Sequence, residues 1–136
     1  MPQARTNVEV AREMIERVNR ADDEGLAALM SLDVRCFPDR NGPDPPFRGR
    51  EAFLRYARGW TEAFEHYAVE ACEYLDFGEY VVVVGRTVAR GRGSSVETSS
   101  EGDTWLFRFR DGEAVEYHEC DNTQEALDAL GAEESN

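Results

Sequence analysis

The sequence predicts an α+β fold in which helices come first and a curved antiparallel sheet follows. Two observations predict it. Apolar residues recur every three or four positions between Val8 and Phe64, as they do in amphipathic helices. Beyond His66 the apolar period changes to two, as it does in strands that bury one face. Because the two kinds of segment are separated along the chain, we expect the helices to cover one face of the sheet.

Three helices are expected in the N-terminal half. Thr6 and Glu9 have the spacing of a capping box, and the apolar stripe after them predicts a first helix over about 7–20. Acidic residues followed by leucines predict a short second helix that ends near Leu32. A third aromatic-rich stripe predicts a helix over about 50–65. The prolines and glycines between the second and third helices predict an irregular loop.

The rest of the chain is expected to form strands and a final helix. Asp111-Gly112 is a strong hairpin signal, which favours antiparallel neighbours. The polar residues of 91–100 indicate a flexible tip between two of the strands. A short C-terminal helix is expected over 123–130, with Thr123 as its N-cap and Gly131 as its stop. The predicted extended segments are 34–37, 67–76, 80–90, 102–110 and 113–121.

Length and charge restrict the kind of protein. The 136 residues fit one domain, 1–136, with an ordered core over about 7–131. A net charge of −13 repels phosphate backbones and anionic lipids, so we expect neither a nucleic-acid nor a membrane partner. The longest apolar run, Val81–Val84, is too short for a membrane span, and no signal peptide is evident, which predicts a cytoplasmic protein. The spacing of histidines and cysteines predicts no metal, and no cofactor motif is found.

The order of several short segments, from about Val8 to Gly131, resembles the SnoaL-like group of the nuclear transport factor 2-like superfamily. The resemblance implies a cone-shaped α+β barrel that dimerises through its outer sheet face and holds a hydrophobic pocket between the concave face and the helices. The group includes polyketide cyclases, ketosteroid isomerases and non-catalytic binding domains, so the fold does not choose among activities. The segments are Phe47-Arg48-Gly49-Arg50-Glu51-Ala52-Phe53, Arg110–Val115, Asp121-Asn122-Thr123 to Leu127, and Leu130-Gly131.

Comparison with ketosteroid isomerase, one member of this group, shows whether steroid isomerisation is to be expected here. Its tyrosine and its protonated aspartic acid, which hold the enolate oxygen, correspond to Met14 and Trp105 here. Neither side chain can replace them, so steroid isomerisation by that constellation is not expected. The family's base corresponds to the region of Asp39, which stays a second candidate for a catalytic base.

SnoaL-type cyclases carry acidic groups on the last strand, and this resemblance points to the strand that ends the sheet here. By analogy with the isomerase, Tyr117, Glu119 and Asp121 face the cavity. Enclosure and mutual repulsion of the two carboxylates would favour the proton exchange that a general acid or base needs. We therefore expect Glu119 as acid or base, supported by Tyr117 and Asp121. The alternatives are that the strand end reaches solvent and Asp121 caps the final helix, or that a bulge turns His118 inward instead.

Aromatic residues are expected to form the pocket wall, because the core wall and the ligand wall coincide in this fold. Arg86 interrupts an apolar alternation and needs a carboxylate partner, which is either Glu119, an anionic ligand or a group on the outer face. The expected ligand-contacting residues are Trp60, Trp105, Phe107, Tyr56, Phe64 and Arg86.

These observations lead to one hypothesis and one alternative. The first is a pocket protein with cofactor-independent acid–base chemistry, as an isomerase, cyclase or hydrolase, on a hydrophobic polyketide-like or aromatic carbonyl compound. The alternative is a non-catalytic ligand-binding domain or a dimeric association domain. A homodimer is expected in either case, because Val81–Val84 is apolar on both faces and the outer one needs cover.

Overall fold

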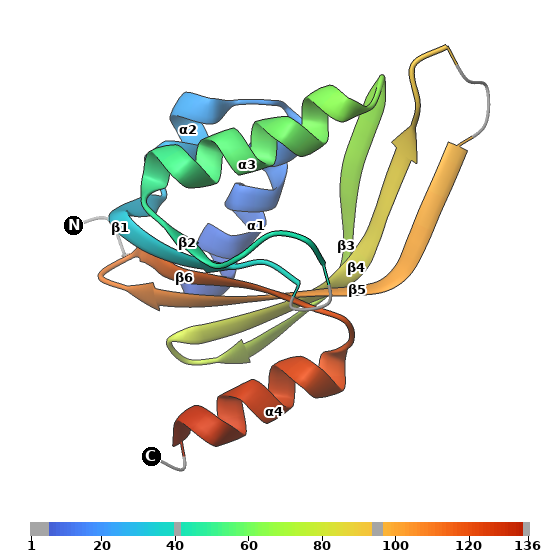
Figure 1. Cartoon of the computed structure of the whole chain (residues 1–136). Coiled ribbons are helices and arrows are strands. Elements are labelled where there is room, and N and C mark those ends of the chain that lie inside the picture. The colour runs from blue at the N-terminus through green and yellow to red at the C-terminus, as the bar shows by residue number, and fades with distance from the viewer. Residues whose placement is uncertain (1–5, 40–41, 94–96, 135–136) are drawn as a thin grey trace.

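A strongly curved sheet with helices on both sides forms the protein in the computed structural model, which describes residues 6–39, 42–93 and 97–134. Helices α1, α2 and α3 lie over the concave face, and α4 lies against the opposite face (Figure 1). The helices are α1 (Asn7–Asn19), α2 (Asp23–Ala27), α3 (Arg50–Ala63) and α4 (Thr123–Glu134). The strands are β1 (Met30–Phe37), β2 (Phe47–Arg48), β3 (His66–Phe77), β4 (Tyr80–Arg90), β5 (Glu97–Arg110) and β6 (Glu113–Cys120). In the described part of the chain, none of the helices is both long and apolar enough to cross a membrane.

The sheet is mixed, which corrects the prediction of a purely antiparallel one. Its order is β2-β1-β6-β5-β4-β3, and β1 runs parallel to β6. Met30 begins β1 opposite Ala114 and is fully buried there, so the predicted extension of the second helix to Leu32 is wrong. The pairing joins residues more than eighty positions apart. Local periodicity cannot predict it, because the period of a strand does not depend on which distant strand pairs with it.

The main core lies between α1 and the concave face. Thr6 caps α1 by accepting a hydrogen bond from the backbone N–H of Glu9 at 3.1 Å, as the capping box predicts. Val10 and Met14 on the inner side of α1 are 2% exposed. They belong to one buried cluster with Val83 and Phe109 of the sheet. This packing fixes the position of α1 against the sheet at the base of the pocket.

Bulges bend the far half of the sheet. Register shifts interrupt the pairing of β3 with β4 between Ala71 and Glu73, and the pairing of β4 with β5 between Gly85 and Arg86. Figure 1 shows these strands curving around the helices. A Cβ atom on Gly85 would lie 2.2 Å from the carbonyl oxygen of Glu70, so the close approach of the backbones requires glycine here. β5 begins at Glu97, and the tip predicted over 91–100 is therefore shorter, while 94–96 lie outside the described residues.

Helix α4 covers the apolar outer face within the same chain. Val82 is fully buried, and Leu106 is 2% exposed, in a cluster with Ala126 and Leu130 of the helix. The apolar strip that suggested a dimer is thus already covered, because a helix from the same chain supplies the contact. α4 also continues past Gly131. Its first turn is capped by Asn122, whose Oδ1 accepts the Glu125 N–H at 2.8 Å, instead of by Thr123.

Gly59→Ala is expected to stabilise the protein. Gly59 is exposed in α3, and nothing lies within 4 Å of the position that a Cβ would take. Alanine restricts the unfolded chain and favours the helix, so the free energy of unfolding should rise by about 0.5–1 kcal/mol. Urea unfolding followed by circular dichroism measures the change. Gly85→Ala is the contrasting variant and should be destabilised; a fall in stability for Gly59→Ala would contradict the prediction.

Candidate functional site

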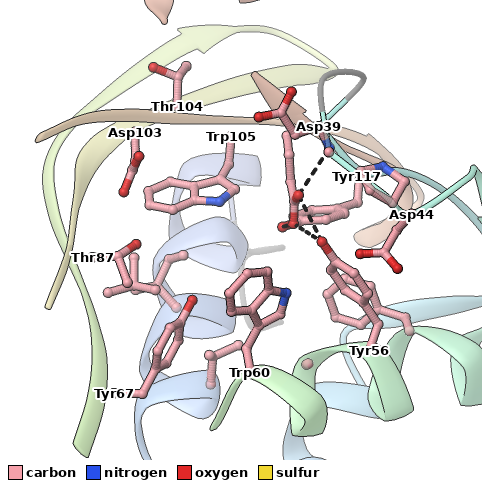
Figure 2. Close-up of a pocket in the computed structure, with 18 of the residues that line it drawn as sticks. Asp39, Asp44, Tyr56, Trp60, Tyr67, Thr87, Asp103, Thr104, Trp105 and Tyr117 are labelled. Carbon is pink, nitrogen blue, oxygen red and sulfur yellow. Dashed lines mark hydrogen bonds between the residues drawn. The ribbon is translucent and has the colours of Figure 1, made fainter. Parts of the chain in front are cut away.

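A pocket of about 540 Å³ opens between the helices and the concave face of the sheet. Side chains of α1, α3 and β3 to β6 line it, together with the loop that follows β1. Its wall is mostly aromatic and aliphatic, and a few polar groups interrupt it (Figure 2). The polar residues on its wall are Asp39, Asp44, Tyr56, Tyr67, Thr87, Asp103, Thr104, Tyr117 and Glu119.

The carboxylate of Glu119 is held by donors from three parts of the chain. The Tyr117 hydroxyl, two residues earlier on β6, donates to Oε2 at 2.7 Å. The Tyr56 hydroxyl of α3 lies 2.8 Å from both carboxylate oxygens. The backbone N–H of Asp39, just after β1, donates to Oε1 at 3.1 Å. Figure 2 draws hydrogen bonds between the pocket residues as dashed lines, and together these three donors fix the orientation of the carboxylate at the pocket wall.

The tyrosine hydroxyls around Glu119 are held in their protonated form. Burial raises the pKa of Tyr117 well above its ordinary value, and the charge of Glu119 adds to the effect. Burial is also the largest cause of the raised pKa of Tyr56, and the hydrogen bond to Glu119 raises it further. Both groups therefore donate hydrogen bonds at neutral pH, and Glu119 is the acceptor. The carboxylate can accept a proton from a bound molecule, and the hydroxyls can stabilise negative charge that forms beside it.

Most of the sequence-predicted residues line this pocket. Glu119, Tyr117 and Asp39 lie together at one wall. Trp60, Trp105, Phe107, Tyr56 and Phe64 also belong to the lining. The alternation along β6 was interpreted correctly for Tyr117 and Glu119, because the strand keeps its period up to Cys120.

Asp121 and Arg86 lie outside the pocket lining. Asp121 is exposed beyond the end of β6, where alternation no longer applies, and its backbone N–H donates to Glu125. Arg86 lies on the opposite side of β4 from the pocket residue Thr87 and pairs with Glu70. Of the alternatives considered for Arg86, the structure therefore matches the one on the outer face and not the pairing with Glu119. Neither residue belongs to the candidate site.

Four further polar residues line the pocket and were not predicted from the sequence: Tyr67, Asp103, Asp44 and Thr87. Asp103 is two residues before Trp105, and the period of two would have placed it on the inner face. Tyr67 and Thr87 lie beside each other on the neighbouring strands β3 and β4 (Figure 2), and the Tyr67 pKa is raised mainly by burial. Asp44 lies in the loop after β1, where no period exists to predict its direction.

His118 points away from the pocket, on the other face of β6. Its Nε2 lies 3.1 Å from Oε1 of Glu116, and its ring stacks on Phe37 with 4.4 Å between centroids. Glu116 is 2% exposed, and its Oε2 lies 2.8 Å from both Arg35 and Arg108. This outer-face cluster is an ion-pair network separate from the pocket. Among the described residues, the acidic, histidine and cysteine side chains form no group of three that is arranged to hold a metal.

Comparison with known proteins identifies the family. The model of the family described as "SnoaL-like domain" matches residues 11–117, which is most of the chain. The chain belongs to the SnoaL-like family. This SnoaL-like protein has the α+β architecture of nuclear transport factor 2-like proteins, with a mixed six-stranded sheet and four helices. None of the curated proteins matches it.

Solved structures share the fold of this SnoaL-like protein at low sequence identity. A nuclear transport factor 2-like protein of unknown function from Burkholderia pseudomallei has 22% identity and a TM-score of 0.72, with 90% of this chain and 95% of that chain covered. A provisionally named polyketide cyclase from Sinorhizobium meliloti has 19% identity and a TM-score of 0.66, with 82% and 94% covered. A Catenulispora acidiphila protein with a ketosteroid isomerase-like fold, in complex with trimethylamine, has 14% identity and a TM-score of 0.70, with 90% and 92% covered. These likenesses show the fold.

Proposed function

We propose that this protein binds a hydrophobic small molecule in its pocket and transfers a proton on it through Glu119, without a cofactor. The observation that carries the proposal is the Glu119 carboxylate, which two tyrosine hydroxyls orient within an aromatic cavity. A fixed carboxylate with spare lone pairs in such a cavity is the arrangement that a general base requires.

A polyketide-like or aromatic carbonyl compound fits this arrangement. Glu119 removes a proton from the carbon next to the carbonyl, and the electron pair of that C–H bond moves to the carbonyl oxygen to form an enolate. The Tyr56 or Tyr117 hydroxyl donates a hydrogen bond to this oxygen. Return of the proton to another carbon gives an isomer. Attack of the enolate carbon on a second carbonyl gives a ring and an alkoxide, which takes back the proton held by Glu119. Asp39, whose side chain also lines the pocket, is the second candidate base.

The comparisons support the coarser part of the proposal. A family with a polyketide cyclase-like neighbour supports a domain that binds small molecules. The trimethylamine complex of the Catenulispora protein is also a small-molecule complex in this fold. The chemistry assigned to Glu119 rests on the pocket of this chain alone.

A non-catalytic binding domain is the second candidate function, and one observation favours it. The three hydrogen bonds that orient Glu119 all come from the protein itself, so the same contacts also suit a purely structural anchor for the pocket wall.

Hydrogen–deuterium exchange distinguishes the catalytic function from the non-catalytic binding function. The protein is incubated in D2O with a panel of aryl ketones and aromatic 1,3-diketones, and ¹H NMR follows the loss of the α-proton signal. Catalysis predicts exchange above the buffer rate for at least one compound. Tryptophan fluorescence measures binding in parallel, because both tryptophans of the chain line the pocket. Binding without faster exchange would support the second function.

The homodimer through the outer sheet face is retained as a proposal. The centre of that face is covered by α4, so contact would involve its uncovered margins, where Phe77 at the end of β3 is 45% exposed. Sedimentation velocity at micromolar concentration should give the mass of two chains. A monomer under these conditions would contradict the proposal.

A further inference from the structure

Two hydroxyl groups of the pocket wall take no part in the proposed reaction. They belong to Tyr67 of β3 and Thr87 of β4, which lie on neighbouring strands: Tyr67 pairs with Ala89, and Val69 pairs with Thr87. All four of these residues line the pocket, so this part of the concave face is turned toward the ligand space. Figure 2 shows Tyr67 and Thr87 on one side of the pocket and Tyr56 on the other.

Aromatic rings connect this wall to the Glu119 carboxylate. Tyr56, whose hydroxyl contacts Glu119, lies 6.4 Å from Trp60 between ring centroids, with the rings edge-on. Trp60 in turn lies 6.4 Å from Tyr67, and these two rings are stacked. In Figure 2, Trp60 lies between the other two rings. Because the two outer rings each carry a hydroxyl group, a flat ligand of two fused aromatic rings can pack along them with one polar substituent at each end.

The Tyr67 hydroxyl keeps its proton and can donate it in a hydrogen bond. Burial is the largest cause of its raised pKa, and the charges of Glu119 and Asp103 raise the pKa further. The hydrogen bond with Thr87 has the opposite effect and lowers the pKa. A hydrogen bond that lowers the pKa of a phenol is donated to the phenol oxygen. Thr87 therefore uses a lone pair of Tyr67 and leaves the Tyr67 proton for another acceptor.

The hydrogen bonds of this pair determine which ligand group it favours. A hydroxyl group on the ligand can accept the proton of Tyr67 and donate its own to the Thr87 oxygen. A methyl group of the same size would displace water from both hydroxyls without replacing its hydrogen bonds. The surroundings are apolar on two sides, because Phe64 stacks on Tyr67 with 6.0 Å between ring centroids and Ala89 lines the adjoining wall. The pair is therefore a localised polar position next to an apolar surface.

We propose that Tyr67 and Thr87 form a second binding subsite, which takes an oxygen substituent at the end of the ligand remote from Glu119. The ligand class is then an aromatic carbonyl compound of two fused rings with a distal hydroxyl group. This inference rests on the proposed function, because it places the reacting carbonyl at Glu119. It adds a second polar end to the hydrophobic compound considered above. The pair selects the ligand and takes no part in the proton transfer.

Two naphthyl ketones that differ in one group test the inference. 6-Acetyl-2-naphthol carries the distal hydroxyl, and 2-acetyl-6-methylnaphthalene has a methyl group of similar size in its place. Equilibrium dialysis with the full chain gives the Kd of each ketone, at a slightly acidic pH that keeps the naphthol protonated. We expect the naphthol to bind about threefold to tenfold more tightly than the methyl compound. Equal Kd values, tighter binding of the methyl compound, or no binding of the naphthol up to its solubility limit would overturn the inference.

Variants assign the preference to the subsite. Tyr67→Phe removes one hydroxyl and should raise the Kd of the naphthol about threefold to tenfold, while that of the methyl compound stays within about twofold. Thr87→Val should change the two Kd values in the same direction. Tyr74→Phe is the matched control, because it removes a hydroxyl from the same strand outside the pocket lining and should leave both values unchanged. A Tyr67→Phe variant that keeps the full preference, or that weakens both ketones equally, would refute the assignment.

The same ketones separate this inference from the proposed catalysis, because their acetyl groups carry the α-protons whose exchange is measured. Preference for the naphthol without α-proton exchange would remove only the catalysis. Exchange without that preference would remove only the second subsite.

Discussion

Glu119→Gln is expected to slow α-proton exchange from a bound ketone by about 10²–10⁴-fold. The substitution keeps the size of the side chain and an oxygen that accepts hydrogen bonds from Tyr56 and Tyr117, so the pocket should keep its shape. It removes the carboxylate that we propose takes the proton. The rate of deuterium incorporation, measured by ¹H NMR at saturating ketone, tests the prediction, and tryptophan fluorescence shows whether binding is preserved.

Two matched variants distinguish Glu119 from the other acids. Asp39→Asn removes the second candidate base and is expected to have a smaller effect, because the contact between Asp39 and Glu119 is made by the Asp39 backbone N–H and survives. Asp121→Asn changes an exposed carboxylate outside the pocket and should leave the exchange rate unchanged. An unchanged rate in Glu119→Gln, together with a large loss in Asp39→Asn, would transfer the role of base to Asp39.

Glu116→Gln is expected to lower the free energy of unfolding by about 3 kcal/mol at pH 7. The Glu116 carboxylate is 2% exposed and lies 2.8 Å from both Arg35 and Arg108. Neutralising it removes the counter-charge that Arg35 and Arg108 share, and the loss is greatest for Arg108, whose side chain is 20% exposed against 47% for Arg35. Arg108 keeps its ion pair with Glu79, which limits the loss. Urea unfolding at pH 7 measures the difference, and Glu113→Gln at the exposed start of β6 is the control, with an expected change within about 0.5 kcal/mol.

The difference in stability between the wild-type protein and Glu116→Gln should change with pH in a defined direction. Burial raises the pKa of Glu116, but hydrogen bonds from Arg108 and His118 and the charge of Arg35 outweigh it, and the net result is a pKa below the ordinary 4.5. A carboxyl whose pKa is lower in the folded state contributes stability above its unfolded pKa and loses that contribution as pH falls through the folded value. The stability difference between wild type and Glu116→Gln should therefore be constant near neutral pH and shrink below about pH 4.5. A difference that stays the same at pH 7 and pH 3.5 would contradict the role of the ion pairs.

Local patterns in the sequence were sufficient to predict the helices and strands that bury only one of their faces. The capping box and the apolar stripe located α1 within one residue, because both signals arise from contacts between close neighbours. The period of two placed Tyr117 and Glu119 on one face of β6, and the resemblance to the isomerase indicated that this face lines the cavity. The net charge of −13 is likewise a property of composition alone.

The tertiary structure decided which elements meet. The parallel pairing of β1 with β6, the cover that α4 gives to Val82, and the meeting of Tyr56 with Glu119 all join segments that are distant along the chain. Periodicity records that a side chain is buried but not which partner buries it, because many partners satisfy the same pattern. The presence of Asp44 and Asp103 in the wall of one cavity therefore became visible only when the loop after β1 and the bent end of β5 were placed in space.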